Sequence, residues 1–390
     1  MAEILLPAFI LLVQAGLRLA GLHFTLRRMA LPAIAAEGQA TLILPLARDV
    51  PGLDALFGTL AAQDLPPALL IVAVEDGHDP AAHHVAALAP TLPFPVRIVV
   101  AGRHDGRGQK NTNLIAALAQ VPPEAEVVVM LDADIRPPPW WLSALATPVL
   151  RGEADLVTGY RWLLPGGARA GAAAQLWAAL DRGFALMPKP QALGFAWGGS
   201  LAMAPAALAR MDLPRRLDGT LSDDLTIGAA ASGLGLRILR RRALLLATPA
   251  EGGAREVLGF AVRQFRILRL YRPVWWALGA AATAVALVAW LALATQALMG
   301  SAAALVVLGA AMAVGLARSP AQRRVVAILG LPRDPPATAL AQAVLAALPP
   351  VVEGFAVALF ALSLRARFIR WRHVDYAVDG PERIRVVARR

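Results

Sequence analysis

The stretch from Pro273 to Ala317 contains no charged residue, and this feature constrains the fold of the chain most strongly. It has room for two helices of about 20 residues, the length that crosses the hydrocarbon core of a bilayer. Gly300 and Ser301 lie where a turn between the two helices would fall. We therefore expect two membrane spans here.

A third apolar stretch, residues 335–364, carries one charge, Glu353, and is interrupted by Pro349 and Pro350. It forms either one kinked span or a re-entrant pair of short helices. The arginine-rich residues that follow should lie in the cytoplasm. Two complete spans would return the chain to the cytoplasm, so a single further crossing by residues 335–364 would put the following residues on the wrong side. The cytoplasmic location therefore favours the re-entrant form.

A weaker apolar segment covers residues 4–22. Its aliphatic residues favour insertion by about 5 kcal/mol in total, which outweighs the cost of about 3 kcal/mol for Arg18. The first residues contain no basic group, so we expect an anchor rather than a cleaved signal peptide. Arg27 and Arg28 follow the segment, so the positive-inside rule places the residues from about 30 onward in the cytoplasm.

The composition excludes several classes of protein. The chain has no cysteine, which rules out disulfides, thiolate metal sites and cysteine nucleophiles. The net charge of +11 comes almost entirely from arginine. We find no nucleic-acid-binding motif and expect no nucleic-acid partner. A basic chain that is 57% hydrophobic is better suited to anionic lipid headgroups or a phosphorylated substrate.

Residues 40–250 alternate short β-branched runs with segments of helical periodicity. This alternation predicts an α/β fold, a doubly wound and mostly parallel sheet whose ligands lie beyond the carboxyl ends of the strands. We expect strands at 41–46, 69–74, 96–100 and 127–131, and helices that include 53–62 and 111–120.

Asp132 and Asp134 directly follow the expected strand 127–131. In an extended chain, two carboxylates two residues apart lie on one side. They can bind one hard divalent cation, Mg²⁺ or Mn²⁺, which in turn would hold a diphosphate. The alternative is a pair of solvated aspartates in a turn before the prolines. Asp76 occupies a similar place after the strand 69–74.

A second acidic pair, Asp223 and Asp224, follows Ser222, which we expect to cap a helix. The pair either complements the helix dipole or supplies a general base near a substrate hydroxyl. The Gly- and Arg-rich segment 102–118 includes Lys110. It is either a phosphate-binding loop that leads into a helix or a flexible surface loop.

Arg263, Arg266 and Arg269 recur every three residues just before the span that begins at Pro273. They either bind lipid phosphates or hold a leaving diphosphate.

These motifs, in this order, resemble an inverting family-2-type glycosyltransferase, most closely the ceramide glucosyltransferase branch. The resemblance covers residues 35–275 and the membrane flanks. The sequences that carry it are "VEDGHDP", "KNTNL", "DADIR", "GGSLAMAPAAL" with "LSDDLTIG", and the arginine motif before the membrane span.

The resemblance implies a donor site for a UDP-sugar. Asp76 would contact the uracil, Asp132 and Asp134 would hold Mg²⁺ or Mn²⁺ with the diphosphate, and Lys110 would belong to the same site. Asp224 would be the catalytic base of a single displacement with inversion.

Arg263 and Arg266 would correspond to the family's arginine motif, or Arg266 and Arg269 in a shifted register. This chain departs from the motif, because Ile267 or Leu270 replaces a tryptophan that lines the acceptor site in the family.

The expected protein is a membrane-bound transferase that moves a sugar, most readily glucose, to the hydroxyl of a membrane lipid such as ceramide. One alternative is transfer of a sugar such as N-acetylglucosamine to a hopanoid or polyisoprenoid lipid. Another is a non-catalytic membrane scaffold with a degenerate nucleotide-binding domain.

The expected organisation is that of a multi-pass protein of the cell (inner) membrane. It has an N-terminal anchor (1–30), a cytoplasmic glycosyltransferase domain (31–272), membrane helices (273–364) and a basic cytoplasmic tail (365–390).

Overall fold

A computed structural model describes residues 2–29, 38–48, 50–166, 171–250, 252–365 and 368–390. The chain forms two compact units. The sheet unit consists of Leu31–Arg161, Lys189–Thr248 and Ala366–Arg390. The helical unit consists of Met1–Ala30, Trp162–Pro188 and Pro249–Arg365.

A seven-stranded sheet forms the centre of the sheet unit, in the order β3-β2-β1-β4-β6-β5-β7. Its strands are β1 (Ala40–Pro45), β2 (Leu69–Val74), β3 (Val96–Val100), β4 (Val127–Leu131), β5 (Leu156–Leu164), β6 (Ser200–Met203) and β7 (Ile238–Pro249). The four strands β3, β2, β1 and β4 are parallel, and β6 is antiparallel to both β4 and β5. The predicted mostly parallel α/β sheet is confirmed.

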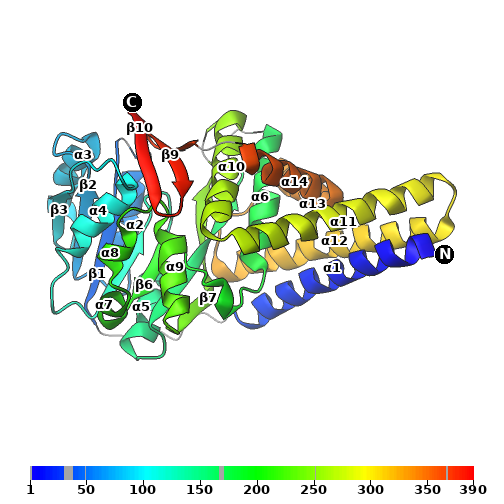
Figure 1. Cartoon of the computed structure of the whole chain (residues 1–390). Helices are drawn as coiled ribbons and strands as arrows, with labels where there is room; N and C mark the ends of the chain where they lie inside the picture. Colours follow the sequence, from blue (N-terminus) through cyan, green and yellow to red (C-terminus); the bar gives the residue numbers. More distant parts are fainter. Residues whose placement is uncertain (1, 30–37, 49, 167–170, 251, 366–367) are drawn as a thin grey trace. The chain divides into compact units, whose positions relative to one another are not determined.

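Both faces of the sheet are covered, as the continuous apolar runs of its strands require. Along β1, Leu42 and Leu44 belong to one hydrophobic core, whereas Ile43 belongs to the other. The helices of this unit are α2 (Leu53–Ala61), α3 (Pro80–Leu88), α4 (Gln109–Leu118), α5 (Trp141–Leu150), α7 (Pro205–Met211), α8 (Leu213–Leu217) and α9 (Asp223–Gly233), with 3-10 turns η1 (Ala89–Thr91) and η2 (Gln191–Leu193) (Figure 1).

The end of the chain, expected to be a basic tail, forms a second sheet within the sheet unit. It has three antiparallel strands, β8 (Phe368–Trp371), β9 (Val374–Gly380) and β10 (Arg383–Arg389). Alternate residues of β9 are buried, Val374 and Tyr376 completely, so this sheet packs by an apolar face and is part of the folded unit.

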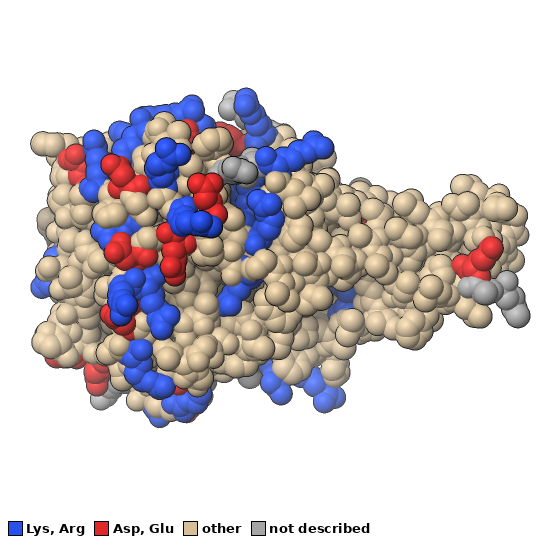
Figure 2. All heavy atoms as spheres, viewed as in Figure 1, with Lys and Arg blue, Asp and Glu red and all other residues tan. Residues whose placement is uncertain are grey.

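The helical unit contains α1 (Ala2–Arg27), α6 (Gly171–Leu186), α10 (Ala254–Tyr271), α11 (Pro273–Leu298), α12 (Ala302–Leu329), α13 (Pro336–Ala347) and α14 (Pro349–Arg365). Helices α1, α11 and α12 are long and apolar enough to cross a membrane. Figure 2 shows almost no charged side chains on the visible face of these long helices.

The helices α13 and α14 meet at Leu348 with a bend of 87°. A pair bent this sharply at a break is either a broken span or a re-entrant loop, in agreement with the two forms expected from Pro349 and Pro350. Helices α10 and α6 pack against α14 through the buried residues Trp177, Ala261 and Leu359.

Candidate active site

The ammonium group of Lys110 joins two acidic segments that are far apart in the sequence. Its Nζ lies 2.8 Å from Oδ1 of Asp132 and 2.9 Å from Oδ2 of Asp223. Burial by itself lowers the pKa of Lys110, but the two carboxylates outweigh this effect and raise the pKa above its ordinary value. The end of β4, the first turn of α4 and the first turn of α9 therefore meet at one point.

The amides of the "KNTNL" segment hold α4 in this position. Asn113 donates through Nδ2 to the carbonyls of Leu46 and Ala73, at the carboxyl ends of β1 and β2. Asn111 donates through Nδ2 to the carbonyl and hydroxyl of Thr220, just before α9. Both amides are fully buried, so their hydrogen bonds fix the helix relative to the sheet edge.

Two glycines close the site from the side of β6. Because β6 is antiparallel to β4, Ser200 pairs with Leu131, and the residues before β6 lie beside Asp132. A Cβ at Gly198 would clash with the carboxylate of Asp223. A Cβ at Gly199 would clash with the indole of Trp197 and would also lie 3.0 Å from Oδ2 of Asp132. Glycine at these two positions therefore leaves space for the Trp197 ring and for the Asp223–Lys110–Asp132 contacts.

Asp132 and Asp134 are close enough to repel one another. Burial, followed by the charge of Asp132, raises the pKa of Asp134 to about 6. A cation would relieve this repulsion, and carboxylate oxygens are the ligands that Mg²⁺ and Mn²⁺ prefer. The described residues contain no group of three or more His, Cys, Asp or Glu side chains suited to a metal. A cation bound by Asp132 and Asp134 would take its remaining ligands from outside the protein, such as a diphosphate and water.

Ser222 caps α9, as predicted, by accepting a hydrogen bond from the backbone N–H of Leu225. The Ser222 hydroxyl and the Leu225 N–H both donate to Oδ1 of Asp224, at 2.6 Å and 2.7 Å. In the described part of the chain, Oδ2 of Asp224 accepts no hydrogen bond. Burial, then the charge of Asp223, raises the pKa of Asp224 to about 6, which suits a base that works near neutral pH.

Asp76 follows β2 at the same edge of the sheet. The strands β2 and β4 both pair in parallel with β1, so the positions after them are about 10 Å apart, two strand spacings. The side chain of Asp76 is about half exposed, with Nη2 of Arg103 at 3.7 Å. A hydrogen bond from the backbone of His78 is the main cause that lowers its pKa.

The neighbouring Glu75, which the sequence reading overlooked, connects this edge to the C-terminal sheet. Its Oε1 lies 2.8 Å from Nε of Arg103 and 3.2 Å from Nη1 of Arg389, and its Oε2 lies 2.9 Å from Nε2 of His373. The Glu75 side chain is 4% exposed. Three basic groups therefore surround one buried carboxylate beside Asp76.

Tyr376 provides a second connection from the C-terminal sheet. Its hydroxyl accepts a hydrogen bond from the backbone N–H of Gln109 at 2.9 Å, the residue before Lys110. Burial raises the pKa of Tyr376 to about 12, so the phenol stays neutral. The backbone N–H of Gln109, the first residue of α4, is thus hydrogen-bonded within the protein. The N–H of Gly108 also donates to the carbonyl of Thr220. The loop before α4 is anchored at its end, unlike the flexible loop considered as an alternative.

Replacing Glu75 with glutamine should loosen the C-terminal sheet. The change leaves the largely buried guanidinium of Arg389 without its buried carboxylate partner, and breaking a buried ion pair costs about 3 kcal/mol or more. We expect faster amide hydrogen exchange in β9 and β10, measured by mass spectrometry. Glu382→Gln, at an exposed glutamate of the same sheet, should leave exchange unchanged. Equal exchange in Glu75→Gln and the parent protein would contradict a bracing role for Glu75.

The remaining predicted residues lie in the helical unit. Arg263 and Arg266 are on α10, and the guanidinium of Arg263 lies 4.8 Å from the ring centre of Phe260. Burial is the main cause that lowers the pKa of Arg266. Their role toward a leaving diphosphate stays a prediction.

A parallel-stranded α/β sheet with an acidic cluster at its carboxyl edge is the architecture of a glycosyltransferase with a GT-A-like fold. The sequence agrees with this class: it matches the family model described as glycosyl transferase family 21 over residues 6–384. The chain belongs to glycosyl transferase family 21.

One solved structure with a TM-score above 0.5 supports the fold. The mannosyltransferase PcManGT from Pyrobaculum calidifontis, in complex with GDP-Man and Mn²⁺, is 18% identical, with a TM-score of 0.51 over 89% of this chain and 99% of that chain. Glucosyl-3-phosphoglycerate synthase from Mycobacterium tuberculosis, in complex with phosphoglyceric acid, is 21% identical, with a TM-score of 0.38 over 59% and 84% of the two chains. S. aureus TarS 1–349 is 16% identical, with a TM-score of 0.39 over 59% and 65%. No curated protein sequence matches the chain.

Proposed function

We propose that this glycosyltransferase moves a sugar, with glucose as the first candidate, from a UDP-sugar to the hydroxyl of a membrane lipid such as ceramide, with inversion. The observation that carries the proposal is the pair of contacts from Lys110 to Asp132 and Asp223. They bring the acidic turn after β4 together with the acidic first turn of α9, so a donor and a base can share one cleft.

The donor would lie along the carboxyl edge of the sheet. Asp76 would contact the uracil, and Asp132 with Asp134 would hold Mg²⁺ or Mn²⁺ against the diphosphate. The cation would supply charge neutralisation of the diphosphate as it leaves. Lys110 would add a positive charge at the same place, next to Asp132.

Asp224 is proposed as the catalytic base. The acceptor hydroxyl would give its proton to Oδ2 of Asp224 while its oxygen forms a bond to the anomeric carbon. The bond from that carbon to the diphosphate breaks at the same time, which inverts the configuration. Arg263 and Arg266 are proposed to stabilise the leaving diphosphate.

The membrane helices are the reason to propose a lipid acceptor. Three helices suited to a bilayer would keep the enzyme where a lipid hydroxyl is exposed, and a soluble acceptor would not require them. We propose a multi-pass protein of the cell membrane with the sheet unit in the cytoplasm, since Arg27 ends α1 and Arg28 follows it.

The rate of transfer should depend on pH through Asp224. A base acts only when it has lost its proton, so a pKa of about 6 predicts a kcat/KM that rises about tenfold per pH unit below 6 and levels off above it. The profile should be measured between pH 4.5 and 8 with a cation at saturation. A flat profile over this range would argue against Asp224 as the base.

The direct test is to incubate membranes that contain the protein with a panel of UDP-sugars and total lipid, and to identify new glycolipids by mass spectrometry. A hexosylated ceramide is the expected product. An N-acetylglucosamine adduct of a hopanoid or polyisoprenoid would favour the alternative acceptor. Absence of any glycolipid, with donor binding also absent, would favour the scaffold.

A further inference from the structure

The helical unit contains a cluster of charged side chains among its apolar helices. Arg18 lies on α1, Arg318 on α12 and Glu353 on α14. Ionisable groups are expensive inside a bilayer and in most proteins mark a site with a function.

The charges of the cluster do not balance. Nη2 of Arg18 lies 2.7 Å from Oε1 of Glu353, and Gln14 donates to the same oxygen at 2.7 Å. Glu353 is 4% exposed on its side chain. Arg318 forms no hydrogen bond or ion pair with the described part of the chain, and its buried Nε has no acceptor there. The cluster thus contains two guanidinium groups and one carboxylate, and only Arg18 is paired with that carboxylate, which gives a net charge of +1.

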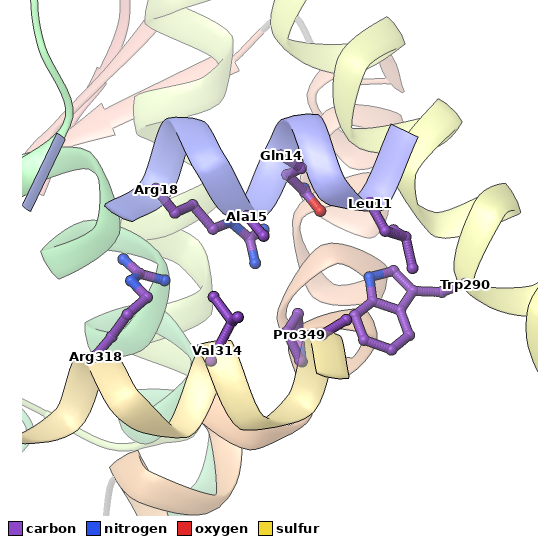
Figure 3. Close-up of a pocket in the computed structure, with 10 residues that line it drawn as sticks. Leu11, Gln14, Ala15, Arg18, Trp290, Val314, Arg318 and Pro349 are labelled. Carbon is purple, nitrogen blue, oxygen red and sulfur yellow. The ribbon is translucent and has the colours of Figure 1, made fainter. Parts of the chain in front are cut away.

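A pocket lies at this cluster (Figure 3). Arg18 and Arg318 both project into the space between α1 and α12, and Trp290 of α11 and Pro349 of α14 also line it. Its empty space, open solvent included, is about 260 Å³, and the part wide enough for a water-sized sphere is about 10 Å³, so a phosphate group would lie at its open side. The indole N–H of Trp290 is buried and has no acceptor within the described residues. The lining therefore offers hydrogen-bond donors and positive charge, and the one carboxylate of the cluster, Glu353, is paired with Arg18.

The two arginines lie at similar depth. At 1.5 Å per residue, Arg18 is about 22 Å from Glu3 along α1, and Arg318 is about 24 Å from Ala302 along α12. A hydrocarbon core is about 30 Å thick. If Glu3 and Ala302 mark one boundary, both guanidinium groups lie one to two helical turns from the other boundary, within reach of lipid headgroups by snorkelling.

We infer that this pocket binds the phosphate group of an anionic membrane lipid, with Arg318 as the main ligand. Guanidinium donors match phosphate oxygens, and a charge-assisted bond is stronger where water is excluded. The net charge favours a negatively charged headgroup over a zwitterionic one, since the cationic part of the latter would meet two arginines. The apolar surroundings favour a lipid over a free phosphate ion. The inference does not depend on the proposed sugar transfer.

Native mass spectrometry of the full chain in neutral detergent, titrated with phosphatidylglycerol or phosphatidylcholine, tests this site. We expect one phosphatidylglycerol to bind more tightly than phosphatidylcholine. Arg318→Gln should weaken its affinity about tenfold or more, the effect of one charge-assisted hydrogen bond. Arg324→Gln is the matched control, because Arg324 is exposed on the same helix and should not affect this binding. Glu353→Gln removes the competing negative charge and should tighten binding.

Three results would overturn the inference. One is equal affinity of Arg318→Gln and the parent protein for phosphatidylglycerol. Another is equal affinity of the parent protein for both lipids, which would indicate an apolar groove only. The third is displacement of the lipid by millimolar inorganic phosphate in the parent protein, which would assign the pocket to a free ion. If Glu353→Gln does not fold, the comparison of Arg318→Gln with Arg324→Gln still tests whether Arg318 binds the lipid phosphate.

Discussion

Asp224→Asn should abolish sugar transfer while the donor still binds. The amide has the shape of the carboxylate and can still accept the hydrogen bonds that Oδ1 receives from Ser222 and Leu225, but it cannot take a proton from the acceptor. We expect transfer to fall by about 10³-fold, within the usual range for loss of a general base. Transfer of radiolabelled sugar to lipid gives the rate, and calorimetry with UDP and Mn²⁺ gives the affinity.

Two variants make this result specific. Asp54→Asn, at an exposed aspartate of α2 that contacts His84, should keep full activity. Asp223→Asn should instead disturb Lys110, which lies 2.9 Å from the carboxylate of Asp223, and so weaken binding of the donor together with the rate. Full activity of Asp224→Asn would remove Asp224 from the role of base.

The double variant Asp132→Ala, Asp134→Ala should lose the cation-dependent part of UDP binding. Without the two carboxylates, the turn after β4 has no oxygen ligands from these side chains to hold Mg²⁺ or Mn²⁺, and Lys110 keeps only Asp223 as its carboxylate partner. The loss of two charged ligands, each contributing about 1.5 kcal/mol or more, predicts a Kd that is at least about 100-fold higher.

The measurement is isothermal calorimetry of UDP with Mn²⁺ and again with EDTA. The parent protein should lose affinity in EDTA, and the variant should bind equally weakly in both conditions. Asp54→Ala serves as the matched control for removal of an exposed carboxylate. If the double variant binds UDP and Mn²⁺ as tightly as the parent protein does, the "DADIR" segment is an ordinary turn.

Much of the fold could be predicted because its signals are local. The predicted strands 69–74, 96–100 and 127–131 coincide with β2, β3 and β4, since β-branched runs of this length favour buried strands. Ser222 could be identified as the cap of α9 because a cap depends on a few adjacent residues. The stretch without charge from Pro273 to Ala317 indicated two long apolar helices, and α11 ends before Gly300 whereas α12 begins after it.

The missed residues act through partners far away in the sequence. Nothing near Glu75 indicates that His373 and Arg389 will surround it, and the basic composition of the last residues suggested a tail rather than the sheet β8–β10. The acceptors of Asn113 lie at the sheet edge and the acceptor of Asn111 is Thr220, just before α9, so neither asparagine has its partner nearby in the sequence. The motif "KNTNL" was the signal that could have identified them.

The sequence by itself determined which segments would be strands, caps and apolar helices, and which side chains could carry charge to a site, because these properties depend on neighbours within a few residues. Only the tertiary structure decided that Lys110 lies between Asp132 and Asp223, and that Arg18 pairs with Glu353 beside Arg318. Such contacts join segments separated by many residues, and the packing of the sheet and of the helices sets which charges meet.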